Sequence, residues 1–250
     1  MSIIKASDQL IRSMTPPAQH SLAIETTAAL GQKLEGKSLP RYIVIEGPIG
    51  VGKTTLANKL AEAFHYPILL EPAAQNPFLN SFYRDGRRNA LPTQLFFLLH
   101  RAQQIANLDH ADLLGPTLVA DFLMEKDDLF ARMTLDEDEY ALYRQIHETL
   151  DIDPPKPDLV IYLQAPVDVL RTRIRDRGID YERDIEAGYL ESLARAYTEF
   201  FHFYDAAPLL VVNAASIDFA NNAVHFESLL DQILAMDGLR QYFNPNPTLL

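Results

Sequence analysis

The sequence predicts a three-layer α/β/α fold built on a five-stranded parallel sheet. Short apolar runs rich in Val, Ile and Leu alternate along the chain with longer segments of helical periodicity, and each run is apolar on both faces. Strands that are buried on both faces and joined by helices form parallel sheets covered on each side. The predicted strands are RYIVIEG (41–47), YPILLE (66–71), PTLVADFL (116–123), PDLVIYLQ (157–164) and PLLVVNA (208–214).

The predicted helices occupy the segments between these strands. They cover residues near 53–64, 91–109, 136–150, 167–177 and 184–205. Residues 1–40 lack a strand-like cluster of β-branched residues and contain a Pro-Pro break and the polar run GQKLEGKSLP, with one possible helix around Leu22–Leu34. We therefore expect an N-terminal extension over 1–40 and one α/β domain over 41–250.

Composition narrows the classes of function. No apolar stretch approaches the roughly 20 residues of a membrane span, and the N-terminus lacks the basic-then-apolar order of a signal peptide. The chain has no cysteine, which excludes disulfides and thiolate metal sites. Its formal charge of −12 repels polyanions. The sequence thus predicts a cytoplasmic protein that binds neither membranes nor nucleic acid.

The segment GPIGVGKT matches the pattern G-x-x-x-x-G-K-[ST], with a predicted strand before it and a helix-forming run after it. Glycines let backbone N–H groups face a phosphate, and a helix N-terminus adds partial positive charge. Lys53 is expected to neutralise the β- and γ-phosphates of ATP, and Thr54 to offer its hydroxyl to Mg²⁺. The predicted ATP-binding residues are Gly47, Pro48, Ile49, Gly50, Val51, Gly52, Lys53, Thr54 and Thr55.

Two carboxylates follow predicted strands. Glu71 ends the second strand and Asp121 follows the apolar run TLVA. Because open α/β sheets bind ligands beyond the carboxyl ends of their strands, both acids should face one crevice. Glu71 is a candidate to accept a proton from a substrate hydroxyl, and Asp121 is suited to Mg²⁺ or its water shell. The alternative for each is a strand-end carboxylate that faces water.

Five segments identify a family resemblance. They are LLEP (69–72), NPFLNSFYRD (76–85), LPTQLFFLLHRAQQ (91–104), ADFLMEKD (120–127) and RIRDRGIDYE (173–182). In this order and spacing they resemble the deoxynucleoside kinase family, particularly its bacterial deoxyguanosine and deoxyadenosine members, from about residue 41 to about residue 233. The resemblance implies ATP- and Mg²⁺-dependent transfer of a phosphoryl group to the 5′-hydroxyl of a deoxynucleoside, and a homodimer. It also implies that Glu71 accepts the proton of that hydroxyl.

The segment around residues 91–104 carries two polar residues in an apolar context. Gln94 and Arg101 are seven positions apart, which places them on one face of a helix. A buried arginine requires an acid, and the resemblance supplies Asp127. By resemblance, Gln94 reads the base while Arg101 and Asp127 complete a polar wall, and Tyr83 and Glu182 hold the 3′-hydroxyl. Family members with this Arg and Asp pair typically take purine deoxynucleosides or deoxycytidine rather than thymidine. The alternative is a solvated glutamine and arginine at a helix edge.

The segment LRTRIRDRG carries four arginines. Arg173 and Arg177 are spaced i, i+4 and share one helical face. They match the family's lid arginines, which stabilise charge on the transferring phosphoryl group. The alternative is a basic helix that faces solvent.

Two segments depart from the family pattern. Phe122 and Leu123 stand where the family has arginine and serine, and Ile179 replaces the second arginine of an R-G-R lid. Both changes remove cations from the phosphoryl path. Candidate replacements are Arg175, Lys126, Arg84 and Arg87. Two alternative functions therefore stay open: a kinase of another small hydroxylated metabolite, or a nucleotide-sensing protein with reduced or lost transfer activity.

Overall fold

The computed structural model describes residue 34 and residues 36–108, 115–219 and 222–245. The chain divides into two units, residues 1–38 and residues 39–250. The helix predicted around residues 22–34 lies outside the described residues, apart from its last position. The predicted extension over residues 1–40 stays a prediction.

Residues 39–250 fold around a six-stranded sheet in which every pair of neighbours is parallel. In spatial order the strands are β2 (Ile68–Leu69), β3 (Leu118–Ala120), β1 (Tyr42–Glu46), β4 (Leu159–Gln164), β5 (Leu209–Asn213) and β6 (Arg240–Phe243). Strand β1 has β3 on one side and β4 on the other, so the strand order reverses beside β1. This reversal creates the crevice where α/β sheets bind ligands.

The predicted count of five strands is wrong by one. The sixth strand, β6, pairs with β5 in the register Leu209↔Arg240 to Val212↔Phe243. Its sequence, RQYF, has no apolar run because an edge strand is only half covered, and none of its four residues is buried. The three-layer α/β fold class itself is confirmed.

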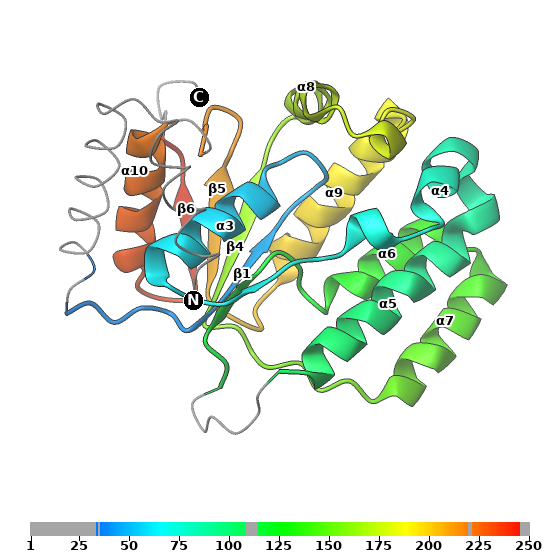
Figure 1. The fold of residues 1–250 in the computed structure, drawn as a ribbon, viewed down its shortest axis with the longest axis horizontal. Helices are drawn as coiled ribbons and strands as arrows, with labels where there is room; N and C mark the ends of the chain where they lie inside the picture. Colours follow the sequence, from blue (N-terminus) through cyan, green and yellow to red (C-terminus); the bar gives the residue numbers. More distant parts are fainter. Residues whose placement is uncertain (1–33, 35, 109–114, 220–221, 246–250) are drawn as a thin grey trace, which may run out of the picture. The chain divides into compact units, whose positions relative to one another are not determined.

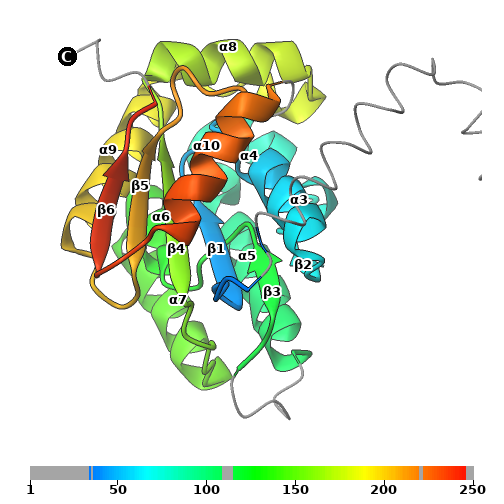
Figure 2. The same cartoon turned by 90° about the vertical axis from the view of Figure 1, so that its left-hand side faces the viewer.

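Helices cover both faces of the sheet (Figures 1 and 2). Figure 2 shows α3 and α10 in front of the strands, α9 and the group α5, α6 and α7 behind them, and α8 across the end where the strands terminate. The helices are α3 (Lys53–Phe64), α4 (Leu79–Asp85), α5 (Ala90–Ala106), α6 (Lys126–Thr134), α7 (Glu137–Leu150), α8 (Val167–Arg177), α9 (Ala187–Phe203) and α10 (Ala223–Leu234).

Local sequence signals fix several helix ends. The side chain of Asp136 accepts from the backbone of Glu139, and Glu139 bonds back to the backbone N–H of Asp136, which forms a capping box at the start of α7. Gly178 ends α8 with φ of 67°. The side chain of Asn222 caps α10 by accepting from the backbone N–H groups of Val224 and His225. Helix α10 itself was not predicted from the sequence.

Aromatic side chains join α9 to the sheet. Phe201 stacks on Tyr162 of β4 with ring centroids 4.2 Å apart, and Tyr197 lies beside both rings. All three are buried, so α9 is held firmly against the strands beneath the cleft described below. Among the described residues, no helix is both long enough and apolar enough to cross a membrane.

Candidate active site

The glycine-rich loop turns sharply between β1 and α3. Gly47 and Gly50 have φ of 146° and 81°, in the region that side chains disfavour. A Cβ on Gly47 would lie 2.4 Å from the carbonyl oxygen of Leu163, and one on Gly50 would lie 2.9 Å from that of Leu170. These two glycines therefore let the loop pass close to β4 and α8.

The two reactive residues of the loop lie at the N-terminus of α3. Lys53 Nζ donates to the carbonyl of Gly47 at 2.8 Å. Burial lowers the pKa of Lys53, and the charge of Lys126 acts in the same direction. Thr54 Oγ1 donates to Asp121 Oδ2 at 2.7 Å. The loop is thus linked directly to the acid that follows β3.

Asp121 also binds the segment that carries Glu71. The backbone N–H of Glu71 donates to Asp121 Oδ1 at 2.7 Å, so each oxygen of Asp121 has one partner. Burial raises the pKa of Asp121 above its ordinary value, although these two hydrogen bonds oppose the shift. One carboxylate therefore holds together the phosphate loop and the carboxyl end of β2.

The Glu71 carboxylate faces two cations. It accepts a hydrogen bond from the guanidinium of Arg101, and its Oε1 lies 3.6 Å from Lys126 Nζ. Burial acts to raise the pKa of Glu71, but Arg101 and Lys126 outweigh it and lower this pKa to about 2. Glu71 is therefore ionised throughout the physiological range.

Arg101 is buried and contacts two acids and two aromatic rings. Its guanidinium pairs with Glu71 and with Asp127 of α6, and it lies 5.3 Å from the ring centroid of Phe97 and 5.8 Å from that of Phe122. The sequence analysis required an acid for this arginine, and the structure provides two. Phe122 thus packs against Arg101 and adds no charge to the site.

Gln94 lies on the same face of α5 as Arg101, about two turns before it, and is 6% exposed. Its Nε2 donates to Thr134 Oγ1 at 3.2 Å, and Thr134 donates in turn to the carbonyl of Phe130 at 2.7 Å. These two linked hydrogen bonds fix the orientation of the Gln94 amide. Because its nitrogen is engaged with Thr134, the Gln94 carbonyl oxygen is the end available as an acceptor.

Arg173 and Arg177, which share one face of α8, bind different partners. Arg177 Nη2 donates to both carboxylate oxygens of Glu182, at 2.6 and 2.5 Å. Arg173 donates to the backbone carbonyls of Val51, Ala214 and Ile217 at 2.8–3.2 Å. Arg173 therefore ties α8 to the phosphate loop and to the loop after β5.

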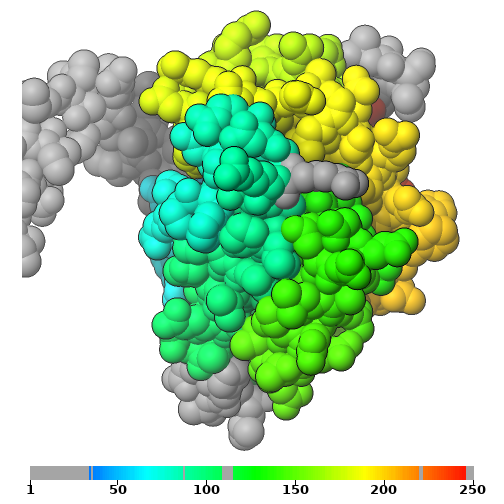
Figure 3. All heavy atoms as spheres, turned by 90° about the vertical axis from the view of Figure 1, so that its right-hand side faces the viewer, coloured from blue at the N-terminus to red at the C-terminus, as the bar shows by residue number. Residues whose placement is uncertain are grey.

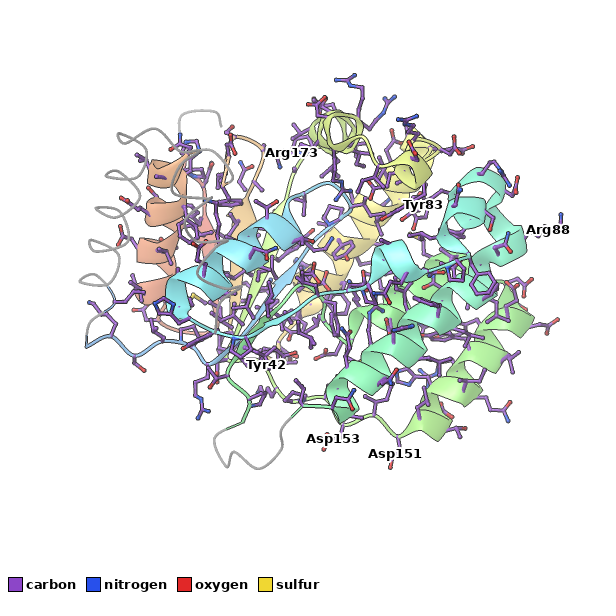
Figure 4. All side chains as sticks on the ribbon, in the orientation of Figure 1. Tyr42, Tyr83, Arg88, Asp151, Asp153 and Arg173 are labelled. Atoms are coloured by element: carbon purple, nitrogen blue, oxygen red, sulfur yellow. The ribbon has the colours of Figure 1, made fainter. Side chains whose placement is uncertain are left out.

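A cleft of about 670 Å³ opens at the carboxyl ends of the strands. Figure 4 shows Tyr83 and Arg173 at this end of the unit and Tyr42, the first residue of β1, at the other. The volume lies within the roughly 300–1,000 Å³ typical of small-molecule sites. Predicted site residues that line the cleft are Ile49, Gly50, Val51, Gly52, Lys53, Thr54, Thr55, Glu71, Tyr83, Gln94, Arg101, Asp121, Arg173, Arg177 and Glu182.

Three predicted site residues are absent from the cleft wall. Gly47 and Pro48 lie at the base of the loop, where their carbonyls accept from Lys53. Asp127 is buried behind Arg101 and reaches the site only through that guanidinium. The structure thus gathers the remaining predicted residues at one cleft.

Sequence reasoning missed Glu46, a fully buried carboxylate at the end of β1. Its oxygens accept from the backbone N–H groups of Gly47 and Leu123, at 3.0 and 2.7 Å, and from the Tyr197 hydroxyl at 2.9 Å, and Oε1 lies 3.0 Å from Lys126 Nζ. The available signal was an acid inside the apolar run YIVIE, directly before the loop. An acid in such a place requires several donors.

A magnesium ion fits the residues that face the phosphate loop. Thr54 and Asp121 present a hydroxyl and a carboxylate, the hard oxygen donors that Mg²⁺ prefers, and Mg²⁺ is usually held by few protein ligands together with phosphates and water. Within the described residues no cluster of three or more His, Asp or Glu side chains with metal-site geometry occurs.

The part of the chain that forms the cleft is similar to known proteins. The family model described as "Deoxynucleoside kinase" matches residues 43–236. A deoxyguanosine kinase of Bacillus subtilis is 37% identical over 193 residues, 75% of this chain and 93% of the relative. A deoxyadenosine/deoxycytidine kinase of the same organism is 29% identical over 202 residues, 78% of this chain and 92% of the relative.

A solved structure has the same fold. The deoxyadenosine kinase from M. mycoides with bound dATP superposes with a TM-score of 0.67 at 25% sequence identity, covering 77% of this chain and 98% of that chain. The family resemblance read from the motifs is confirmed by these matches. The protein belongs to the deoxynucleoside kinase family.

Proposed function

We propose that the protein transfers the γ-phosphoryl group of ATP to the 5′-hydroxyl of a purine deoxynucleoside. In this proposal the loop amides and Lys53 hold the triphosphate, and Glu71 receives the hydroxyl proton. A bond forms between the 5′-oxygen and the γ-phosphorus while the bond to the β,γ-bridging oxygen breaks. The products are ADP and the deoxynucleoside 5′-monophosphate.

The observation that carries the proposal is the hydrogen-bonded sequence from Thr54 through Asp121 to Glu71. Its two links, each 2.7 Å, join the residue after the phosphate-loop lysine to the backbone of the proton acceptor. A loop threonine beside an acid that follows a strand is common to phosphate-loop proteins, but a generic phosphate-binding loop has no need of the second link, from Asp121 to Glu71. Phosphoryl transfer does, because its rate depends mainly on positioning donor and acceptor and on stabilising charge.

The low pKa of Glu71 suits this chemistry. A carboxylate with a pKa of about 2 is a weak base, so it accepts the proton late, after the bond to phosphorus is well advanced. A loose transition state makes little demand for early proton removal. Until then Glu71 orients the hydroxyl as a hydrogen-bond acceptor.

Thr54 and Asp121 are the residues that would hold Mg²⁺. The ion, when bound, neutralises charge on the β- and γ-phosphates. Asp121 also positions Glu71 through its second oxygen. Its two roles are therefore carried by different atoms.

Purine preference is supported by the polar wall of the cleft. Gln94 offers a fixed carbonyl oxygen. Arg101 lies seven positions later on the same helix, and its guanidinium pairs with Glu71 and with Asp127. The relatives reported above include a deoxyguanosine kinase and a deoxyadenosine/deoxycytidine kinase. Tyr83 and Glu182, from α4 and the turn after α8, are proposed to hold the 3′-hydroxyl.

We also propose a cytoplasmic homodimer that associates through α5 and α7. These helices form a broad surface (Figure 3) on which Leu99 and Leu142 are 49% and 46% exposed. A Leu99→Glu, Leu142→Glu double variant should elute as a monomer in size-exclusion chromatography with light scattering. An unchanged dimer, or a monomeric wild type, contradicts this assembly.

The function is tested by incubating the purified protein with Mg-ATP and each of the four deoxynucleosides. We expect 5′-monophosphates of deoxyguanosine or deoxyadenosine, identified by chromatography against authentic standards. Lys53→Ala should lose this activity. Failure of every deoxynucleoside to yield product above that variant would refute the proposal, and release of ADP with another hydroxylated metabolite would favour a different acceptor.

A further inference from the structure

A buried lysine occupies the wall of the cleft beside the proton acceptor. Lys126, the first residue of α6, is 2% exposed and lines the cleft. Its Nζ lies 3.0 Å from Glu46 Oε1 and 3.6 Å from Glu71 Oε1. Glu46 immediately precedes the phosphate loop and Glu71 lies on the acceptor side. The ammonium group therefore lies between the two halves of the site.

Stability alone gives a weak reason for burying this lysine. Glu46 already accepts from the backbone N–H groups of Gly47 and Leu123 and from the Tyr197 hydroxyl. Replacing a buried ion pair with apolar residues of similar size is often neutral or stabilising. The cost of burying the Lys126 ammonium is therefore consistent with a functional role at the place where it is held.

In the described part of the chain, the other cations that line the cleft already have partners, and Lys53 among them binds the carbonyl of Gly47. Arg101 pairs with Glu71 and Asp127, Arg173 binds backbone carbonyls, and Arg177 binds Glu182. Two replacement cations considered from the sequence are largely exposed and pair with neighbouring acids. These are Arg84, 62% exposed beside Asp85, and Arg175, 77% exposed beside Asp176.

The residues directly after Asp121 add no polar side chain to the site. Leu123 is buried in the core, and Phe122 packs on the Arg101 guanidinium. The sequence thus lacks a cation at position 122, and the start of α6 supplies one four positions later. From that position the Lys126 ammonium group reaches the Glu71 carboxylate.

Resting on the proposed function, we propose that Lys126 is a catalytic residue whose ammonium group contacts the accepting 5′-oxygen and the phosphoryl group in transfer. As the new oxygen–phosphorus bond forms and the bond to ADP breaks, negative charge on the phosphoryl oxygens attracts Nζ. Nζ then turns from Glu71 towards the phosphoryl group while Glu46 keeps it in place. Glu71 receives the hydroxyl proton, which later passes to solvent.

The absence of cysteine from the chain makes a direct test possible. A Lys126→Cys variant has one thiol, which 2-bromoethylamine, applied in denaturant before refolding, converts to a side chain ending in an ammonium group near the original position. We expect kcat of the unmodified variant to fall by about 100-fold or more, with KM for ATP and deoxynucleoside changed by less than about threefold. Aminoethylation should restore most of the rate.

Two controls isolate the charge. Iodoacetamide, which attaches a neutral group, should restore nothing to the same variant. Arg175→Cys, at an exposed cation of α8, should keep wild-type kcat with or without alkylation. Wild-type kcat in unmodified Lys126→Cys, or equal recovery with both reagents, would overturn the proposal.

A second variant covers the case in which Lys126→Cys fails to fold because Glu46 is left without its cation. Glu46→Gln, Lys126→Met removes both charges, and circular dichroism reports its fold. A folded double variant with kcat at least about 100-fold below Glu46→Gln supports the role, and equal kcat refutes it. A wild-type enzyme that phosphorylates no deoxynucleoside refutes the proposed function instead, so the two failures are distinguishable.

Discussion

Glu71 is paired with Arg101, a residue 30 positions later in the chain, where the carboxyl end of β2 meets α5 in the cleft. Glu71 follows the short strand β2, and Arg101 comes from the second half of α5. The pair therefore fixes the proposed proton acceptor relative to the proposed base-binding wall. Substitution at either residue should disturb both chemistry and stability.

Replacing Glu71 with Gln should lower kcat by about 10²–10⁴-fold, because the amide keeps the shape of the side chain but accepts no proton. KM for the deoxynucleoside should change less than kcat. Steady-state kinetics with Mg-ATP measures both. Glu62→Gln, at an exposed acid on α3, is the matched control and should behave as wild type. Comparable kcat in Glu71→Gln and wild type would show that the proton goes elsewhere.

The same pair predicts a pH-dependent contribution to stability. The pKa of Glu71 falls from its ordinary 4.5 to about 2 in the folded protein, so ionised Glu71 stabilises the fold above pH 4.5. That contribution is lost as the pH falls from 4.5 towards 2. The free energy of unfolding of wild type should exceed that of Glu71→Gln by at most about 3 kcal/mol at pH 7, and the gap should close near pH 2–3. A gap independent of pH would contradict the ion pairing.

Arg101 and Asp127 should show strong coupling in a double-mutant cycle. Arg101→Met leaves Asp127 buried without its cation and should cost about 3–5 kcal/mol of unfolding free energy. Adding Asp127→Asn should recover a substantial part of that loss. Urea denaturation measures each variant. Arg132→Met, which breaks an exposed pair with Asp128, should cost less than about 1 kcal/mol. Additive losses at Arg101 and Asp127 would argue against a direct pair.

Gly50→Ala should damage the phosphate loop. A Cβ at this position, at φ of 81°, would lie 2.7 Å from Ile174 Cγ1 and 2.9 Å from the Leu170 carbonyl, so the loop or α8 must move. We expect KM for ATP to rise at least about tenfold, because the displaced loop amides no longer fit the phosphates. The rate should also fall, since misplacement by about 1 Å can cost about 100-fold in rate. Gly188→Ala is the control. Among the described residues, no atom outside its own stretch of helix would lie within 4 Å of a Cβ at Gly188, and helix propensity favours Ala there by up to about 1 kcal/mol. An unchanged KM in Gly50→Ala would refute this account of the loop.

Long periodic segments were the most predictable part of the fold. The helices at 53–64 and 167–177 have the predicted bounds, and each predicted strand contains an observed one. The signal is strong because the loop motif and a C-terminal glycine mark the helix ends, and because β1 and β4 are buried on both faces. By contrast, β6 and the seven-residue α4 were missed, since short elements at an edge take their structure from packing that local sequence does not record.

The candidate site shows the same division. Sequence identified residues that follow strands or share a helical face, such as Glu71 and Gln94, because topology alone brings them to one edge. It did not identify the interaction of Glu46 with Lys126, which are 80 positions apart and meet only when α6 packs beside β1. The sequence also left open which cation stands in for the arginine absent at position 122. That choice depends on distances between side-chain ends, such as the 3.6 Å from Lys126 Nζ to Glu71 Oε1, which a sequence does not give.

In the proposed function, one cleft holds ATP and the accepting hydroxyl end to end. The most direct measurement is calorimetric titration with deoxyguanosine or deoxyadenosine joined through its 5′-oxygen to the phosphate chain of ATP. We predict one molecule bound per chain, displacement by both ATP and the free deoxynucleoside, and affinity at least about 100-fold above that of either alone. Affinity no greater than that of ATP, with free deoxynucleoside still binding at saturation, would contradict the account.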